Sequence, residues 1–381
     1  MKKSRVLIAG GGVAAIEVAL ALRDLAGDRV GVEIFAPRRD FVYRPYAVGE
    51  PYGAARVARY DLDDLARRAG AGFHLDSVAS VDAGARRIAT HDGEKLPYDY
   101  FVVAAGAQLL WPVPGAITFW GIADELDVQK VMGRIHSGEV RGLAFTMPAV
   151  DGWALPLYEL ALLAQAEIAR AGIGDVQLTV VTPEDSPLQI FGRRASALFA
   201  ELLDERGIEV ISRTHPVRFE DGHLVIVPGD HLDFDAVVSL PKLEGRRIRG
   251  LLHDPGGFVR VDDHCRVLNH DRLFAAGDIT SFPVKQGGIA TQQADVIAEA
   301  IAADVGVAIE PQSFDPILRG VLWTGEEPRY LQGWLSGGHG ETSSFTAEPP
   351  WGEREGKIVG RYLTAFLAAL NGSRAPEAIS G

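Results

Sequence analysis

The stretch RVLIAGGGVAAIEVALALRDL (residues 5–25) decides the fold of this 381-residue chain. An apolar run precedes the glycines, as in a strand buried within a parallel sheet. Gly10, Gly12 and Ala15 then match the pattern G-x-G-x-x-G/A. The first residue permits a tight turn, the second leaves room for a pyrophosphate, and the third lets the next helix pack closely. That helix directs free N–H groups at the phosphates, so the stretch predicts a dinucleotide-binding Rossmann-like domain.

The second strand of this domain lacks a residue that the fold usually supplies. Residues 30–37 predict the strand, which normally ends in an acidic side chain that bonds the ribose hydroxyls. Ala36 and Pro37 stand there instead, and Arg38 follows. We therefore expect Arg38 near the nucleotide, and a ribose contact that differs or is made by backbone or water.

The composition excludes several classes of protein. The length corresponds to two or three domains, and 47% apolar with 23% charged residues is ordinary for a globular protein. The net charge of −13 opposes binding to nucleic acid. No metal-ligand spacing is evident, and the single cysteine, Cys265, rules out an intramolecular disulfide and a C-x-x-C redox pair. Because no signal peptide or membrane-spanning run is evident, we expect a cytoplasmic location.

Two later segments identify the dinucleotide. Residues 96–107 (LPYDYFVVAAGA) and residues 272–302, which include AAGDITSFPVKQGG, follow the first motif in a fixed order. In this order the motifs resemble those of the two-dinucleotide-binding-domain flavoproteins, the pyridine nucleotide-disulfide oxidoreductase superfamily. The resemblance implies an α/β fold of two Rossmann-like domains with FAD in the first. It also implies that Asp278 bonds the FAD and that a helix beginning near Gly287 faces the flavin, where its N-terminus stabilises negative charge.

The motifs and the resemblance together predict the cofactor-binding residues. Tyr43, Arg44 and Pro45 match a loop that approaches the flavin in the resembling enzymes. The predicted cofactor-binding set is Gly10, Gly12, Ala15, Arg38, Arg44, Pro45, Val78, Ala105, Gly106, Gly277, Asp278, Lys285, Gln286, Gly287 and Gly288.

Within that superfamily the chain resembles most the sulfide:quinone oxidoreductases and the flavoprotein of flavocytochrome c sulfide dehydrogenase. The matching stretches are residues 40–51, 116–125, 187–210 and 282–295, and type II NADH dehydrogenases are the next neighbours. The sulfide-oxidising enzymes need at least two redox cysteines beside the flavin. Cys265 is the only cysteine and falls in a predicted hairpin, so we interpret it as structural and exclude a cysteine relay.

The turn TMPAVDGWALPLYELALL (residues 146–163) stands where NAD(P)H-using members of the superfamily carry a second glycine motif. Gly152 is its only glycine, and Trp153 and Leu155 occupy positions where a pyrophosphate needs open backbone. The next strand, residues 176–183, ends without an acidic residue for the ribose. We therefore predict a Rossmann scaffold that has lost its nicotinamide site.

Two side chains are candidates for the chemistry beside the flavin. Glu159 lies one turn into the helix after Gly152, where a carboxylate relays protons to the flavin or, alternatively, stays buried and caps the helix. Lys285 precedes the flavin-facing helix and either offsets the charge of a reduced flavin or pairs with a surface acid. Trp153 is a further candidate for stacking near the flavin ring.

The predicted domain limits are residues 1–113 with 252–315 for the FAD domain, 114–251 for the second domain and 316–381 for a C-terminal α+β interface domain. Residues 316–338 predict two strands joined by a turn, and residues 337–355 a loop that covers the flavin. Residues 356–370 predict an amphipathic helix, for which core packing or a homodimer contact is favoured over peripheral contact with the inner face of a membrane.

These patterns predict an FAD-dependent oxidoreductase. The flavin would pass electrons from an unidentified donor to a quinone or an electron-transfer protein. Three alternatives stay open: a type II-like NAD(P)H dehydrogenase, a sulfur-compound oxidase that uses the flavin directly, and a flavin-binding protein without turnover.

Overall fold

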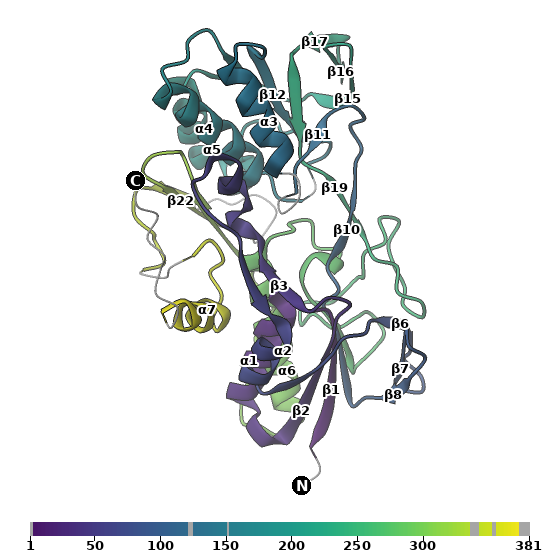
Figure 1. Ribbon diagram of the computed structural model, residues 1–381. Coiled ribbons are helices and arrows are strands. Elements are labelled where there is room, and N and C mark those ends of the chain that lie inside the picture. Colours follow the sequence, from purple (N-terminus) through teal and green to yellow (C-terminus); the bar gives the residue numbers. More distant parts are fainter. Residues whose placement is uncertain (1–2, 121–124, 151, 336–342, 353–355, 373–381) are drawn as a thin grey trace.

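The computed structural model describes residues 3–120, 125–150, 152–335, 343–352 and 356–372. Two α/β lobes lie one above the other, joined by a pair of antiparallel strands, and the C-terminal elements lie along one side of both lobes (Figure 1). Among the described residues no helix has the length and apolar character needed to cross a membrane.

The first lobe is built on a five-stranded parallel sheet with the strand order β20-β9-β1-β2-β5. Its strands are β1 (Ser4–Ala9), β2 (Val30–Phe35), β5 (Ala71–His74), β9 (Tyr100–Val103) and β20 (Leu273–Ala275). Helices α1 (Val13–Leu25) and α6 (Gly287–Asp304) pack against each other, and a meander covers the other face. The meander strands are β6 (Val78–Asp82), β7 (Arg87–Thr90) and β8 (Lys95–Pro97).

The alternation of side chains along β1 explains the two layers. Val6 and Ile8 join the core cluster that contains α1 and α6, whereas Leu7 and Ala9 join the cluster on the meander side. Because successive side chains of a strand point to opposite faces, an all-apolar strand is buried on both sides. The predicted Rossmann-like fold of this lobe is therefore confirmed.

The second lobe repeats this design with a parallel sheet in the order β11-β18-β12-β13-β14. The strands are β11 (Ile117–Thr118), β12 (Gly142–Thr146), β13 (Gln177–Val181), β14 (Ile208–Ile211) and β18 (Ala236–Ser239). Its helices are α3 (Glu125–His136), α4 (Leu155–Arg170) and α5 (Arg193–Glu205). A three-stranded antiparallel meander completes the lobe: β15 (His215–Glu220), β16 (His223–Val227) and β17 (His231–Asp233). Strands β10 (Ala107–Leu110) and β19 (Lys242–Gly245) pair antiparallel between the lobes.

Short elements connect these layers near the carboxyl edge of the first sheet. They are β3 (Asp40–Tyr43), the 3₁₀ helix η2 (Arg44–Tyr52), β4 (Ala58–Asp61), α2 (Leu62–Arg68) and the 3₁₀ helix η4 (Gly277–Ile279). Two further 3₁₀ helices are η1 (Gly27–Arg29) and η3 (Gln189–Phe191). Segment η2 contacts both α3 and α4, so it binds the first lobe to the second.

The C-terminal residues form a small sheet and one helix. Strands β21 (Ile317–Leu322) and β22 (Arg329–Trp334) confirm the predicted hairpin. The expected loop over residues 337–355 is wrong in part, because β23 (Ser343–Thr346) adds a third strand, whereas residues 337–342 and 353–355 lie outside the described residues. The sheet packs on the core of the second lobe and the helix on that of the first.

The C-terminal helix begins later than the sequence predicted. Helix α7 spans Leu363–Gly372, not residues 356–370. The carboxylate of Glu17, from α1, accepts hydrogen bonds from the backbone N–H groups of Tyr362 and Leu363 at 2.9 and 2.6 Å. Because a carboxylate satisfies free N–H groups at the first helical turn, Glu17 fixes where α7 starts. Ile358, which falls within the predicted helix range, lies before the helix and is buried.

Candidate cofactor and proton-transfer site

The glycine turn after β1 has the geometry of a nucleotide cradle. Gly10 has a φ of +127°, and a Cβ there would lie 2.0 Å from the carbonyl oxygen of Ala104. A Cβ on Gly12 would meet no atom within 4 Å, which leaves open space at the start of α1. Ala15 is fully buried between α1 and the neighbouring elements. The geometry of these three positions is compatible with the turn that their spacing predicts.

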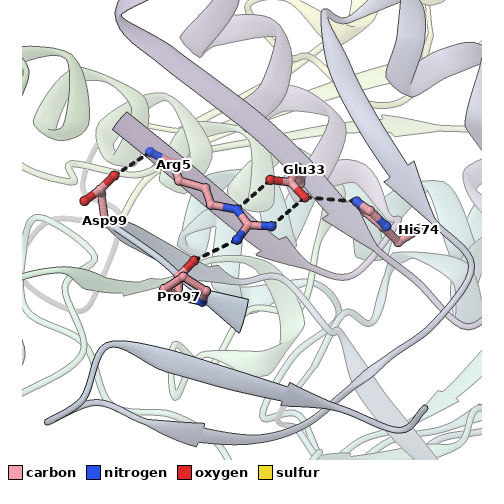
Figure 2. Close-up of polar contacts among 5 residues, drawn as sticks. All are labelled: Arg5, Glu33, His74, Pro97 and Asp99. Atoms are coloured by element: carbon pink, nitrogen blue, oxygen red, sulfur yellow. Dashed lines mark hydrogen bonds and ion pairs between the residues drawn. The ribbon is translucent and has the colours of Figure 1, made fainter. Parts of the chain in front are cut away.

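The one acidic side chain on β2 is not available to a ribose. Glu33 accepts hydrogen bonds from the guanidinium of Arg5 at 2.7 and 3.0 Å, and its Oε2 lies 3.0 Å from Nε2 of His74 (Figure 2). The Arg5 guanidinium holds the pKa of this carboxyl below its usual value. Ala36 is buried and Arg38 is exposed at the end of the strand. A ribose contact at this edge must therefore come from another group, as expected.

Ligands of such sheets bind in a crevice outside the carboxyl ends of the strands, and Asp278 and Arg44 lie at this edge of the first sheet. The Asp278 carboxylate is partly exposed and has no hydrogen bond within the part of the chain that the structure describes. Burial raises the pKa of Asp278, whereas the charges of Lys285 and Arg44 lower it. The guanidinium of Arg44 also lies 5.5 Å from the ring centroid of Trp120. An aspartate with free acceptor oxygens between two cations is suited to bind hydroxyl and phosphate groups.

Helix α6 begins at the same crevice with its first turn fixed in place. The side chain of Gln286 caps the helix: Oε1 accepts from the N–H of Ile289 at 3.0 Å, and Nε2 donates to the carbonyl of Arg319 at 2.8 Å. A Cβ on Gly287 would lie 2.6 Å from Cδ1 of Ile358, so the C-terminal segment contacts the helix start closely. Gly288 is buried within the same turn.

The remaining predicted residues lie around this edge. Ala105 and Gly106 directly follow β9, and Gly106 has a φ of +66° with open space where a Cβ would be. Val78 is the first residue of β6 and Pro45 the second residue of η2; both are half-buried. Gly277 donates its backbone N–H to Oε1 of Gln293 at 2.7 Å, which orients the turn that carries Asp278.

Lys285 lies in the interior, against the wall of the crevice. Its Nζ donates to the carbonyl oxygen of Thr280 at 2.5 Å and lies 3.8 Å from the ring centroid of Phe258. The side chain is almost fully buried, so the cation acts on neighbouring groups through a low-dielectric surrounding.

A second buried lysine, which the sequence analysis missed, pairs with Glu159. The Nζ of Lys357 lies 2.5 Å from Oε1 of Glu159, and the exposed fractions of the two side chains are 6% and 2%. The same oxygen accepts from the backbone N–H of Trp323 at 2.8 Å. Burial raises the pKa of Glu159 and lowers that of Lys357, and the attraction between them opposes both shifts. Glu159 is buried, as one alternative expected, but it pairs with Lys357 and does not cap its own helix.

This pair lies next to the start of α6. Lys357 directly precedes Ile358, the residue that contacts Gly287. Its Nζ lies 4.2 Å from the ring centroid of Trp323, and Tyr46 stacks on that ring at 5.4 Å. A cavity of about 70 Å³ opens beside the segment, lined mainly by Tyr43, Tyr46, Tyr60, Ile358, Leu363 and Leu367. Gly356 and Ile358, the neighbours of Lys357 in the sequence, line this cavity, whereas Glu159 and Lys357 do not.

Comparison with known proteins identifies the family. A model of the pyridine nucleotide-disulphide oxidoreductases matches residues 4–141 and 158–301. The chain belongs to this family. It is accordingly an FAD-dependent oxidoreductase.

Individual relatives agree with this assignment. An NADH dehydrogenase-like protein of Mycobacterium tuberculosis is 25% identical over 297 residues, 73% of each chain. A sulfide-quinone reductase of Aquifex aeolicus is 24% identical over 338 residues, 79% of this chain and 76% of the relative. The solved structure of the Aquifex aeolicus sulfide:quinone oxidoreductase superposes with a TM-score of 0.80 at 21% identity, over 97% of this chain and 90% of that one.

The residues in the crevice fit FAD. Open space beside Gly12 and Gly106 leaves the backbone accessible to phosphates, and the carboxylate of Asp278 can accept hydrogen bonds from hydroxyl groups. The start of α6 supplies a positive dipole end for the electron-rich edge of a flavin.

The turn at Gly152, where the sequence predicts a lost nicotinamide site, makes backbone hydrogen bonds to the segment before α6, although a Cβ on Gly152 would meet no atom within 4 Å. The N–H of Gly152 donates to the carbonyl of Pro283 at 3.1 Å, and the N–H of Lys285 donates to the carbonyl of Gly152 at 3.2 Å. The turn thus pairs with the segment that leads into α6. The family model leaves residues 142–157 unmatched, and these hold β12 and this turn.

Side chains fill the space beyond β13 as well. Glu184 is 4% exposed, and the hydroxyl of Tyr158 donates to its carboxylate at 2.5 Å. Burial raises the pKa of Glu184 to about 7. The C-terminal sheet covers Phe191, since a Cβ on Gly320 would lie 3.0 Å from the Phe191 ring, and Trp153 packs on the same ring at 5.8 Å.

Cys265 lies in the interior of the first lobe. Its side chain is fully buried in the core cluster that contains α1 and α6. Burial and the nearby Asp262 and Asp263 raise the pKa of its thiol. A buried thiol of raised pKa is a poor nucleophile, which supports its interpretation as structural.

The larger cavity of the second lobe lies away from this chemistry. It has a volume of about 340 Å³ and is lined by residues 135–138, 140–141 and 173–176. These residues precede β12 and β13, whereas ligands of such sheets bind beyond the carboxyl ends of the strands.

Proposed function

We propose that this chain is an FAD-dependent reductase of quinones that does not use NAD(P)H as its electron donor. The observation that carries the proposal is the buried pair of Glu159 and Lys357 beside the start of α6. Relatives support the acceptor class, because they include a sulfide-quinone reductase and an NAD(P)H-ubiquinone oxidoreductase from Arabidopsis thaliana.

The crevice residues bind and orient the cofactor. Gly10, Gly12 and Ala15 would form the pyrophosphate turn, and Asp278 would accept hydrogen bonds from hydroxyl groups of the ribityl chain. Arg38, Arg44, Pro45, Val78, Ala105 and Gly106 would line the same edge, and Gln286, Gly287 and Gly288 would hold the helix start. When bound, FAD supplies the two-electron chemistry of the reaction.

The pair of Glu159 and Lys357 would transfer protons to the quinone. Reduction of a quinone to a quinol takes up two electrons and two protons, and a buried acceptor needs a local proton donor. Lys357 carries protons on Nζ, and burial makes one of them easier to release by lowering the lysine pKa. Glu159 Oε1, 2.5 Å away, stabilises the charged lysine and can take or return a proton. Lys285, buried against Phe258, would offset negative charge in the crevice.

The backbone hydrogen bonds of the turn at Gly152 favour a donor other than NAD(P)H. A dinucleotide needs open backbone at its pyrophosphate and a free acceptor for its ribose. Here the carbonyl and N–H of Gly152 are paired with the segment before α6, and Glu184 is held by Tyr158. The cysteine relay of sulfide-oxidising enzymes is absent from the sequence, since Cys265 stands alone.

Reoxidation of the reduced protein by a quinone tests the proposal. The FAD-loaded protein is reduced anaerobically with dithionite and mixed with a short-chain ubiquinone analogue in a stopped-flow instrument. We expect rapid return of the oxidised flavin spectrum, slowed roughly 100-fold in Glu159→Gln because proton delivery is lost. Glu184→Gln is the matched control, a buried glutamate of the same lobe that bonds Tyr158.

The two variants separate the possible outcomes. A slow reaction in Glu159→Gln with a normal reaction in Glu184→Gln supports the relay. Equal rates in all three proteins would exclude Glu159 from proton transfer, and no reaction with quinone in the unaltered protein would overturn the proposed acceptor.

A further inference from the structure

Three side chains with metal-ligand chemistry meet on the meander of the second lobe, at the end of the molecule remote from the FAD lobe (Figure 1). His223 on β16 and Asp233 on β17 are directly opposite in the antiparallel ladder. Their Nδ1 and Oδ1 atoms are 2.7 Å apart, and Nε2 of His231 lies 3.5 Å from the same Oδ1. The two imidazole rings are 4.5 Å apart at their centroids.

The alternation of the two strands holds these side chains on one face. Leu224 and Leu232 are paired across the ladder and point to the opposite face, where Leu224 is fully buried and Leu232 packs on the same cluster. His231 and Asp233, two residues apart on β17, share the outer face with His223. Apolar packing on one side therefore fixes the ligand atoms on the other.

The spacing matches that around a small divalent cation. Nitrogen and oxygen ligands bound at about 2.0–2.2 Å to one tetrahedral or octahedral ion lie roughly 3 Å apart. The distances from Asp233 Oδ1 to His223 Nδ1 and to His231 Nε2, 2.7 and 3.5 Å, lie on either side of that value. The exposed fractions of the three side chains, 51%, 39% and 77%, leave room for water to complete the coordination.

We propose that His223, His231 and Asp233 form a site for a divalent transition-metal ion such as Zn²⁺. A set of two imidazoles and one carboxylate suits such ions better than it suits the hard cations Mg²⁺ and Ca²⁺, which favour oxygen ligands. Strand β17 is a three-residue edge strand that pairs with β16 alone in its sheet. A bound ion would join these strands and secure the edge of the meander.

A second cluster in the chain provides a contrast. Asp262, Asp263 and His264 also lie within ligand distance of one another. Only one imidazole is present there, and Oδ1 of Asp262 already accepts from the backbone N–H groups of His264 and Arg266. His264 therefore serves as a matched control: an accessible histidine beside carboxylates that lacks a second imidazole.

Zinc binding to the full-length, FAD-loaded protein without an affinity tag tests the site. The protein is treated with a chelator, dialysed and titrated with Zn²⁺ by isothermal calorimetry, with metal analysis after equilibrium dialysis as a second readout. We expect saturable binding of Zn²⁺ that His223→Asn and His231→Asn each weaken by about tenfold or more, whereas His264→Asn leaves the affinity unchanged. The flavin spectrum and thermal midpoint confirm that each variant is folded.

The outcomes either support or overturn the site. Selective loss in the His223 and His231 variants, reproduced in Asp233→Asn, supports it. Binding that falls equally in His264→Asn, or no Zn²⁺ binding by the unaltered protein, would overturn it.

Discussion

At the scale of single residues, the central feature is the ion pair of Glu159 and Lys357, which joins α4 to the C-terminal segment. Both side chains are buried, so each charge depends on the other for its stabilisation. Removing one partner of a buried pair leaves an uncompensated charge and typically costs about 3–5 kcal/mol. The pair therefore combines a proposed proton-transfer role with a strong mutual dependence.

A double-mutant cycle measures that dependence. We predict that Glu159→Gln and Lys357→Met each lower the free energy of unfolding by about 3–5 kcal/mol, and that the double variant loses clearly less than their sum. The exposed pair of Lys130 and Asp127 is the control, and its removal is expected to cost less than about 1 kcal/mol. Additive losses at Glu159 and Lys357 would show that the two charges do not stabilise each other.

A second residue-scale prediction concerns Asp295, whose carboxyl faces that of Glu17 between α6 and α1. Burial and the Glu17 charge raise the pKa of Asp295 to about 8, while Arg361 opposes and Glu299 adds to the shift. The folded state then binds more protons than the unfolded state above about pH 4, so this group makes stability fall as pH rises toward 8.

Asp295→Asn removes that loss because the amide cannot ionise. We expect its thermal midpoint to match that of the unaltered protein near pH 4 and to exceed it by about 2–4 °C or more at pH 9. Calorimetry across this pH range makes the measurement. A midpoint difference that is constant with pH would contradict a proton held in the folded state.

At the scale of elements, the start of α6 depends on a residue from the C-terminal segment. Because a Cβ on Gly287 would lie 2.6 Å from Cδ1 and 2.8 Å from Cγ1 of Ile358, we predict that Gly287→Ala costs about 1–3 kcal/mol and weakens FAD retention. Adding Ile358→Ala should cost less than the sum of the single changes. Gly133→Ala in α3, where a Cβ would meet no atom, is the control and should be neutral or stabilising. If Gly287→Ala retained FAD and stability as fully as Gly133→Ala, that result would contradict the close contact.

Local signals explain which elements the sequence predicts well. The turn after β1, the hairpin of β21 and β22, and the helix after Gln286 each depend on residues within a few positions of one another. The start of α7 depends on Glu17, 346 positions away, and Lys357 finds Glu159 across 198 positions. No local pattern contains those pairs. The predicted start of the helix was therefore too early, and the role of Lys357 was missed.

At the scale of the whole molecule, the C-terminal residues hold the two lobes together. The sheet of β21, β22 and β23 contributes Leu318, Leu322 and Leu331 to the second-lobe core, whereas Leu363 and Leu367 of α7 join the first-lobe core. The same sheet covers Phe191 at the carboxyl end of the second sheet. The C-terminal segment therefore packs on the cores of both lobes.

The most direct test of this account is an anaerobic titration of the FAD-loaded protein with NADH and NADPH, followed by its flavin absorbance. We predict that neither nucleotide bleaches the flavin band, whereas dithionite bleaches it fully and a quinone then restores it. Rapid, stoichiometric bleaching by NADH would contradict the account, because it would require a working nicotinamide site beside Gly152.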